Sequence, residues 1–192
     1  MVLGSHNSWS YLKPTKWWMR LISFTAKCQR TTIQTQYLQG ARCFDLHIRI
    51  GKDDIMTVVH GPIEYCYLVR ILNVFDTLNN YKDVSIRLIL DLRVRYAKKE
   101  YENQITFFKL WCYALEDDYP NIKFWCGRIL PTWEQGCIFD YEPSCEEKHG
   151  SVTKPKWFWG LWPWLYARFH NKQIIEQSSD KDILLIDYIN IK

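Results

Sequence analysis

The chain has 192 residues, of which 47% are hydrophobic and 16% aromatic, so it can bury a sizeable core and is expected to form one domain, residues 1–192. Its net charge of +4 is mild, and the basic residues are spread along the chain, which argues against a nucleic-acid-binding protein. The charge suits an anionic substrate or a membrane surface without requiring either.

The chain shows no signs of export or of membrane insertion. The N-terminus has no basic region followed by an apolar run, so no signal peptide is expected, and no stretch of about 18 apolar residues could span a bilayer. The seven cysteines form no Cys-x-x-Cys pair and show no zinc-ligand spacing. We therefore expect free thiols and a monomeric protein that is cytoplasmic or peripheral at a membrane.

The first half of the chain predicts short strands and helices in alternation. Residues 17–33 mix aromatic and polar side chains and form either a helix or a lid. A helix over residues 32–39 is expected to end at Gly40, because glycine is a common helix terminator. The expected strands cover residues 1–5, 42–50 and 55–59, with a turn at 52–54.

The second half continues the alternation. The expected helices cover residues 65–81, 102–115 and 164–177, where apolar side chains recur at helical spacing. The expected strands cover residues 84–94, 122–126, 136–141 and 183–189. Residues 142–156 are polar, contain two prolines and are expected to form a loop excursion. Strands that alternate with helices pair in parallel, so the α/β class is predicted.

Two histidines stand in turn-like contexts at probable strand ends. His6 lies in the segment Gly-Ser-His-Asn-Ser, and His60 lies in Val-Val-His-Gly-Pro. An aspartate, Asp45, and several arginines lie between or near them. Two imidazoles with an acid and cations can cleave a phosphodiester, because one imidazole accepts a proton from an attacking hydroxyl and the other donates one to the leaving oxygen.

These segments, in this order, resemble the X-domain of phosphatidylinositol-specific phospholipase C, and more the small metal-independent bacterial type than the calcium-dependent eukaryotic type. The other matching pieces are Gly-Ala-Arg-Cys-Phe-Asp-Leu-His at residues 40–47, Ile-Leu-Asp-Leu-Arg at 89–93, and an aromatic run at 162–166 followed by Asp-Tyr-Ile-Asn at 187–190. Each piece is weak alone, but five in order make chance unlikely.

The resemblance implies a small, irregular TIM-like (β/α) barrel of the PLC-like phosphodiesterase type, trimmed relative to the usual ~250 residues, with its chemistry at the C-terminal ends of the strands. It implies that His6 is the general base and His60 the general acid. It also implies that Asp187 orients His6 and stabilises its charged form. The alternative for Asp187 is an ordinary acid at a strand end.

The resemblance also bears on metals. The positions that hold calcium in the eukaryotic branch correspond here to Asn7, Asp45, His47 and Arg93. An arginine opposes a calcium site, which prefers several oxygen ligands, so neither a metal nor another cofactor is expected. Calcium through Asn7, Asp45 and His47 is the alternative. In the metal-free branch a fixed cation stabilises the transition state.

One position departs from the family pattern, because the arginine on the second strand is replaced by His47. A protonated His47 could take its role, Arg49 could reach in from the same strand face, or Arg93 could hold the phosphate alone. Asp45 is expected to anchor the neighbouring cations. The candidate catalytic residues are therefore His6, Asp45, His60, Arg93 and Asp187. The candidate substrate-binding residues are Asn7, His47, Arg49 and Arg93.

A tryptophan-rich segment with flanking lysines and arginines suits the headgroup region of a bilayer. The expected membrane contacts are Trp157, Trp159, Trp162 and Trp164. The alternative is that these rings fill a core left thin by the trimmed barrel. Trp17 and Trp18, next to Lys16 and Arg20, are candidates for a second half of the same rim.

Two classes of function remain open from the sequence. The first is an enzyme that cleaves a phosphoinositide or related phospholipid at a membrane, giving a cyclic phosphate and diacylglycerol. The second is a weakened or inactive module that binds phosphorylated headgroups or serves a structural role. The family's inositol-binding residues cannot be transferred, since Asp140 stands where one basic residue is expected. His149 and His170 lie outside the motifs and are expected at the surface.

Overall fold

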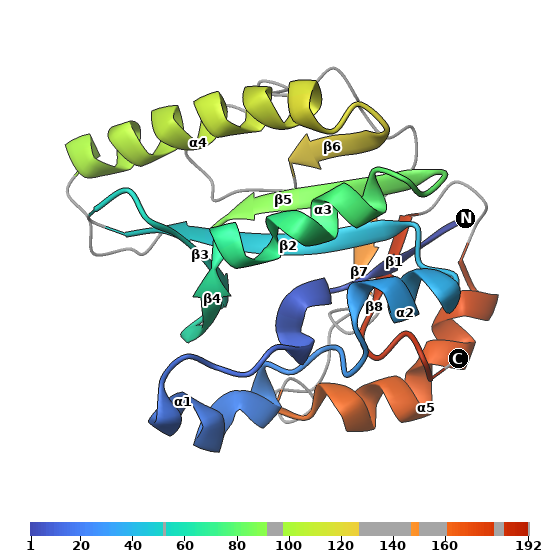
Figure 1. Ribbon diagram of the computed structural model, residues 1–192. Helices are drawn as coiled ribbons and strands as arrows, with labels where there is room; N and C mark the ends of the chain where they lie inside the picture. The colour runs from blue at the N-terminus through green and yellow to red at the C-terminus, as the bar shows by residue number, and fades with distance from the viewer. Residues whose placement is uncertain (52, 92–97, 127–146, 150–160, 179–182, 192) are drawn as a thin grey trace.

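A computed structural model describes residues 1–51, 53–91, 98–126, 147–149, 161–178 and 183–191 (Figure 1). The strands are β1 (Val2–Ser5), β2 (Cys43–Ile50), β3 (Met56–His60), β4 (Ile63–Tyr67), β5 (Val84–Leu90), β6 (Ile122–Cys126), β7 (Glu147–His149) and β8 (Ile183–Ile186). The helices are α1 (Trp17–Ile22), α2 (Ile33–Leu38), α3 (Leu72–Leu78), α4 (Lys98–Asp118) and α5 (Pro163–Glu176). Short 3-10 turns are η1 (Ser8–Tyr11), η2 (Ser23–Thr25) and η3 (Leu68–Ile71).

The strands form one curled sheet in which β6, β5, β2, β1, β8 and β7 follow one another in parallel. The C-terminal half of β2 also pairs with β3, and β3 with β4, so an antiparallel hairpin extends from that end of the sheet. Figure 1 shows α4 on one side of the strands and α1 and α5 on the opposite side. The predicted α/β architecture is confirmed. Within the described residues no ladder joins β6 to β7, so a closed barrel stays a prediction.

Most predicted elements are confirmed to within a few residues, and the helix over 32–39 is one example. Thr32 caps α2 by accepting a hydrogen bond from the Thr35 N–H, and Gly40, at φ 100°, ends it as expected. The strand predicted over 84–94 ends at Leu90, and the strand predicted over 183–189 ends at Ile186.

Two predictions are wrong. The helix expected from residue 65 begins only at Leu72, because residues 63–67 form β4 and η3 follows it. The loop expected over 142–156 contains β7, which pairs with β8. The strand expected over 136–141 lies outside the described residues.

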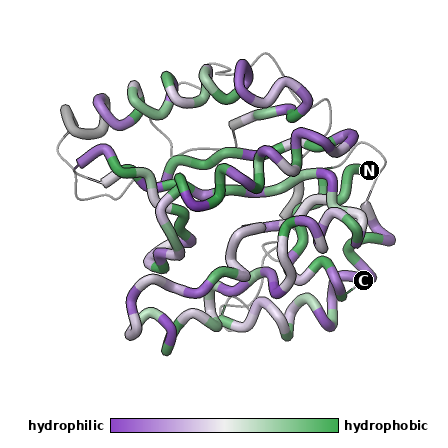
Figure 2. The backbone as a smooth tube through the Cα atoms, viewed as in Figure 1, coloured by the Kyte–Doolittle hydropathy of each residue, from purple (hydrophilic) through white to green (hydrophobic). Residues whose placement is uncertain are grey.

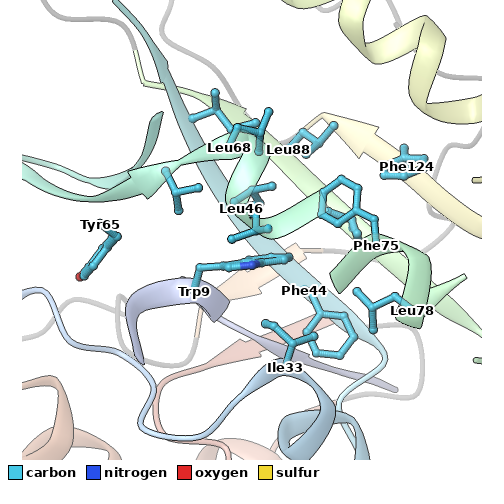
Figure 3. Packing of buried hydrophobic residues seen from close by; sticks show 14 of the residues in the cluster. Trp9, Ile33, Phe44, Leu46, Tyr65, Leu68, Phe75, Leu78, Leu88 and Phe124 are labelled. Carbon is cyan, nitrogen blue, oxygen red and sulfur yellow. The ribbon is translucent and has the colours of Figure 1, made fainter. Parts of the chain in front are cut away.

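The core is one large apolar cluster that joins the sheet to the helices. Its largest fully buried side chains include Trp9 from η1, Phe44 from β2, Phe75 from α3 and Phe124 from β6. Figure 3 shows Trp9 beside Leu46, in the middle of this cluster. Figure 2 shows hydrophobic residues along much of the central strands. Burying apolar surface from segments far apart in sequence fixes the strand ends on which the polar residues stand.

Strand β1 lies between β2 and β8, where there is little room. A Cβ at Gly4 would clash with the Leu185 side chain and would lie 3.2 Å from the Cys43 Cβ. The glycine that precedes Ser5 and His6 therefore lets β1 approach both neighbours closely. This packing fixes the position of His6, the residue after β1, relative to the ends of β2 and β8.

Cys28, Cys43, Cys66 and Cys112 are free thiols. Cys43 and Cys112 are fully buried and pack as small apolar side chains. Among the described residues, no helix combines the length and the hydropathy needed to cross a bilayer.

Candidate active site

His6 and Asp187 are brought together by strand register. Ser5 at the end of β1 lies opposite Ile186 at the end of β8, so the next residue of each strand emerges at the same level. The His6 Nδ1 lies 2.7 Å from the Asp187 Oδ1, and both residues are buried. The predicted pair is therefore present. Since Nδ1 faces the carboxylate, the other ring nitrogen, Nε2, is directed elsewhere.

The charge of His6 is stabilised in place. Burial disfavours the imidazolium, but attraction to Asp187, the hydrogen bond to it and the nearby Asp45 outweigh burial and the repulsion from Arg87. The pKa of His6 is accordingly raised above its usual value. This imidazole is thus both oriented and made more basic, as the base of an acid–base pair needs to be.

Strand β2 lines the site through alternate residues, because side chains two apart in a strand share a face. The buried Asp45 Oδ1 accepts a hydrogen bond from the Arg87 Nη1 at 2.9 Å. Its Oδ2 accepts one from the Asn7 N–H at 3.0 Å and lies 3.2 Å from the His47 Nε2. Burial raises the pKa of Asp45, but His47, Arg87 and His6 together hold it well below the usual range. Asp45 therefore anchors its neighbours as an anion, as expected.

Asn7 follows His6 in a left-handed turn, at φ 44°. Asparagine tolerates this conformation better than most residues. Its side-chain nitrogen lies 3.4 Å from the His6 Nε2, so Asn7 reaches the nitrogen that faces away from Asp187. The predicted contact of Asn7 with the centre of the site is consistent with this position.

Three imidazoles face one another at the centre. The ring centroids of His60 lie 5.8 Å from those of both His6 and His47, and the rings of His6 and His47 are 6.5 Å apart. The His60 Nδ1 donates to the Ala26 carbonyl at 2.8 Å, which leaves its Nε2 as an acceptor in the neutral ring. Burial and the nearby His6 and His47 lower the pKa of His60 to about 4.

Arg49 shares the strand face of His47 but does not lie free at the centre. Its Nη2 lies 2.6 Å from the Asp91 Oδ2 and also donates to the Gly61 carbonyl, which follows His60 directly. Its Nη1 lies 3.7 Å from the Glu64 carboxylate. Through these contacts Arg49 holds the His-Gly-Pro turn in place. Arg93 lies outside the described residues.

The guanidinium that lies beside Asp45 is that of Arg87 on β5, a residue that none of the sequence motifs indicated. Arg87 is buried and also lies against the Trp125 ring. The signal was a lone arginine within the apolar segment Val-Ser-Ile-Arg-Leu-Ile-Leu. A buried charge of this kind requires a partner, and the acid two positions before His47 provides it.

Buried amides hold the loops of the site, and these too were missed. The Gln29 side chain donates to the carbonyls of His6 and Ile186 and accepts from the Ile189 N–H. Asn171 on α5 donates to the Asp187 carbonyl at 2.8 Å. Gln29 lies outside the helices and strands, and Asn171 is one of several polar residues of α5, so nothing in the sequence distinguishes either from a solvated residue.

Cys28 adds a buried thiol on the far side of the same histidines. Its Sγ lies 3.9 Å from the His60 Nδ1, and its side chain also approaches Asp187. Burial, with the nearby Asp187, raises the pKa of this thiol well above its usual value. The Cys28 thiol is therefore held in its neutral form.

The tryptophans predicted at the membrane divide into three groups. Trp157 and Trp159 lie outside the described residues. Trp162 is 48% exposed, whereas Trp164 is half-buried, with the guanidinium groups of Arg30 and Arg168 each 5.6 Å from its ring. On α1, Trp17 is 73% exposed and Trp18 44%. The exposed tryptophan rings that the structure describes thus come from α1 as well as from the start of α5.

The two histidines outside the motifs also have defined places. His170 is half-buried, stacks on the Tyr166 ring and lies 2.9 Å from the Tyr166 carbonyl through Nδ1, so it is less solvated than expected. His149 ends β7. His170 does not belong to the central group of imidazoles.

Solved structures of phosphatidylinositol-specific phospholipase C resemble this fold over nearly its whole length. The enzyme from Listeria monocytogenes gives a TM-score of 0.63 at 16% identity and covers 97% of this chain and 87% of its own. A point mutant of the Staphylococcus aureus enzyme gives a TM-score of 0.61 at 15% identity, with 97% and 84% covered. Another S. aureus structure, concerned with modulating membrane binding, gives 0.57 at 16%, with 97% and 85% covered.

No protein-family model and no curated protein sequence matches the chain. At identities of 15–16% the likeness concerns the fold, on which many different sites can be built. The family that the five sequence motifs indicate is also the family whose solved structures share this fold. The chain therefore has the fold of the bacterial phosphatidylinositol-specific phospholipases C.

Proposed function

We propose that the protein is a phosphodiesterase that cleaves a phosphoinositide, or a related phospholipid with a hydroxyl next to its phosphate, at a membrane surface. The observation that supports this most is the buried His6–Asp187 pair facing a second imidazole, His60, at a ring distance of 5.8 Å. A protein that only binds a headgroup has no need for a histidine oriented by a buried carboxylate.

The proposed reaction moves two protons, forms one phosphorus–oxygen bond and breaks another. The His6 Nε2 accepts the proton of the headgroup hydroxyl as its oxygen attacks the adjacent phosphorus. His60 donates a proton to the diacylglycerol oxygen as the bond between phosphorus and this oxygen breaks. The products are a cyclic phosphodiester of the headgroup and diacylglycerol. Each proton transfer of this kind contributes about 10²–10⁴-fold to the rate.

A cationic group has to stabilise the charge on phosphorus-bound oxygens in the transition state. We assign this role to His47, held at 3.2 Å by Asp45, and to Arg93. Arg87 supports it indirectly by fixing the Asp45 carboxylate. Arg49 positions the turn that carries His60, through its bond to the Gly61 carbonyl.

We further propose that the reaction needs no metal. The calcium alternative through Asn7, Asp45 and His47 offers few oxygen ligands, whereas calcium takes about six to eight. The acid at the end of β5, Asp91, is already paired with Arg49 at 2.6 Å. The geometry therefore favours acid–base chemistry by the imidazoles.

The pH dependence follows from the two shifted histidines. The reactive enzyme carries one proton on the His6–His60 pair, whichever ring holds it in the free state. Cleavage should fall below pH about 4, where His60 also becomes charged, and above the raised pKa of His6, where both rings are neutral. An anionic phosphodiester bound between the rings stabilises the proton on His60. The profile of kcat/KM against pH is expected to be bell-shaped.

Asp187→Asn tests the origin of the alkaline limb. Burial lowers the pKa of His6, and without the Asp187 charge this effect dominates. The alkaline limb of kcat/KM should therefore move to lower pH, and the maximal rate should also fall. Glu176→Gln, a change on the last turn of α5, is the matched control and should leave the limb in place. An unmoved alkaline limb in Asp187→Asn would show that His6 does not set it.

Membrane contact is proposed through α1, η2 and the start of α5. Besides the two tryptophans of α1, the exposed apolar side chains there are Leu21, Ile22, Phe24 and Trp162. Figure 1 shows α1 and α5 together on one side of the sheet. Exposed tryptophans near lysine and arginine suit the interfacial layer of a bilayer.

The double change Trp17→Ala and Trp18→Ala should weaken binding to anionic vesicles about tenfold or more, since each buried large apolar side chain contributes about 1.5–3 kcal/mol. Cosedimentation with phosphatidylinositol-containing vesicles measures this. Tyr113→Ala removes an exposed ring from α4, on the opposite side, and should change nothing. Equal losses in both proteins would argue against α1 as the docking surface.

The function is tested with two phospholipids in mixed micelles that contain chelator. Phosphatidylinositol has a hydroxyl next to its phosphate, whereas the choline headgroup of phosphatidylcholine has none and cannot cyclise. Release of a water-soluble phosphate from the first alone is the expected result. Cleavage of both would contradict attack by a headgroup hydroxyl. Binding to the micelles without cleavage would favour the headgroup-binding module.

A further inference from the structure

The replacement of an arginine by His47 gives the centre of this site a set of ligands for a transition metal. The Asp45 Oδ2 lies 3.2 Å from the His47 Nε2 and 3.9 Å from the His6 Nε2. The three ligand atoms of His6, Asp45 and His47 all lie within 4.8 Å of one another. A tetrahedral zinc ion bound at about 2.0–2.2 Å holds its ligand atoms about 3.3 Å apart. The Asp45–His47 pair already has this separation, and the His6 Nε2 has to move closer to Asp45 to reach it.

The groups behind these ligands are also those of a zinc site. Zinc-bound histidines usually donate their other ring nitrogen to a carboxylate, and the His6 Nδ1 lies 2.7 Å from Asp187. The Asp45 carboxylate is itself fixed by Arg87 at 2.9 Å and by the Asn7 N–H at 3.0 Å. The donors would therefore be oriented before an ion arrives.

The charge of the site favours a cation. Asp45 and Asp187 bring two buried negative charges, of which the Arg87 guanidinium compensates one and a proton on the histidines the other. The ion would take the place of the protons on the His6 Nε2 and the His47 Nε2, so its binding releases protons. His60, with its ring 5.8 Å from both other imidazoles, borders the same group.

We infer that a divalent transition metal ion, with Zn²⁺ as the probe, binds His6, Asp45 and His47 and inhibits the enzyme by occupying the nitrogen that accepts the proton. Two imidazoles and one carboxylate select such an ion over calcium, which prefers oxygen ligands. The inhibition rests on the proposed function, whereas the binding does not.

The test is competition for Zn²⁺ between the metal-free protein and a chromogenic chelator. The expected result is one Zn²⁺ per chain and no competing effect of Ca²⁺. His47→Ala and His47→Arg should weaken binding by more than about 100-fold, because loss of an outer partner alone costs about 10–100-fold. Asp187→Asn removes such a partner and should fall within that smaller range. Thermal melts of each variant establish that it is folded.

Cys28→Ser is the matched control, because Cys28, His6 and Asp187 form a second group of potential ligands on the other side of the His6 ring. Zinc binding that survives His47→Ala but is lost in Cys28→Ser would overturn the assignment. Displacement of Zn²⁺ by Ca²⁺ would overturn it as well.

Activity separates this inference from the proposed function. Zinc binding without cleavage of any lipid would support the metal site and contradict the proposed enzymatic function. Cleavage that is unaffected by bound Zn²⁺ would overturn the inhibition. Cleavage that requires Zn²⁺ would confirm the site but contradict both the inhibition and the metal-free mechanism.

Discussion

His60→Ala is expected to lower kcat/KM for phosphatidylinositol by about 10²–10⁴-fold, the usual contribution of one general acid or base. The imidazole is half-buried, and its hydrogen bond is to the Ala26 carbonyl, so its removal should leave the apolar core untouched. A steady-state assay with a melting curve for each protein measures the effect. His170→Ala removes a histidine outside the site and should retain full activity. Undiminished cleavage by a folded His60→Ala protein would contradict the assignment.

An activated substrate separates the acid from the base. A nitrophenyl phosphodiester of the headgroup has a leaving group that needs little protonation, so His60→Ala should cleave it nearly as well as the unchanged protein. His6→Ala should remain slow with both substrates, because the attacking hydroxyl still has to lose its proton. The opposite pattern would show that His60 is the base and His6 the acid.

Asp45→Asn is expected to destabilise the protein by about 3–5 kcal/mol, the usual cost of breaking a buried ion pair. Asp45 is fully buried and holds Arg87, His47 and the Asn7 N–H, so a neutral amide would leave the buried Arg87 without its carboxylate. Urea unfolding at neutral pH measures the loss. Asp76→Asn on the exposed side of α3 should stay within about 0.5 kcal/mol.

The difference in unfolding free energy between the unchanged protein and Asp45→Asn should grow as the pH rises from acid to neutral. The pKa of Asp45 is lowered in the folded protein, so its charge contributes stability above the usual aspartate pKa. That contribution is lost as the pH falls through the lowered value, and the two proteins should then converge. A gap of less than 1 kcal/mol at neutral pH would show that Asp45 is not the anchor of the site.

The resemblance to the phospholipase C family implied the His6–Asp187 pair. The structure gives its physical basis, because the parallel strands β1 and β8 deliver the residues after their ends to one edge of the sheet. The sequence also predicted that His47 and Arg49 share a strand face, since strand alternation is local. It did not predict that Arg49 turns to Asp91 and Gly61, because that choice depends on segments distant in sequence.

The missed residues have a common physical cause. Arg87, Gln29 and Asn171 act through buried hydrogen bonds whose partners come from other elements. The helix predicted from residue 65 failed for a related reason. Its apolar spacing is real, but residues 63–67 gain more by pairing with β3, so tertiary hydrogen bonding overrides the local pattern.

The most direct measurement of the central claim is phosphorus-31 NMR of the protein with phosphatidylinositol micelles in the presence of chelator. Acid–base catalysis by His6 and His60 predicts a cyclic phosphodiester as the first product, without any added metal. A phosphomonoester as the first product, or turnover that appears only after calcium is added, would contradict the account.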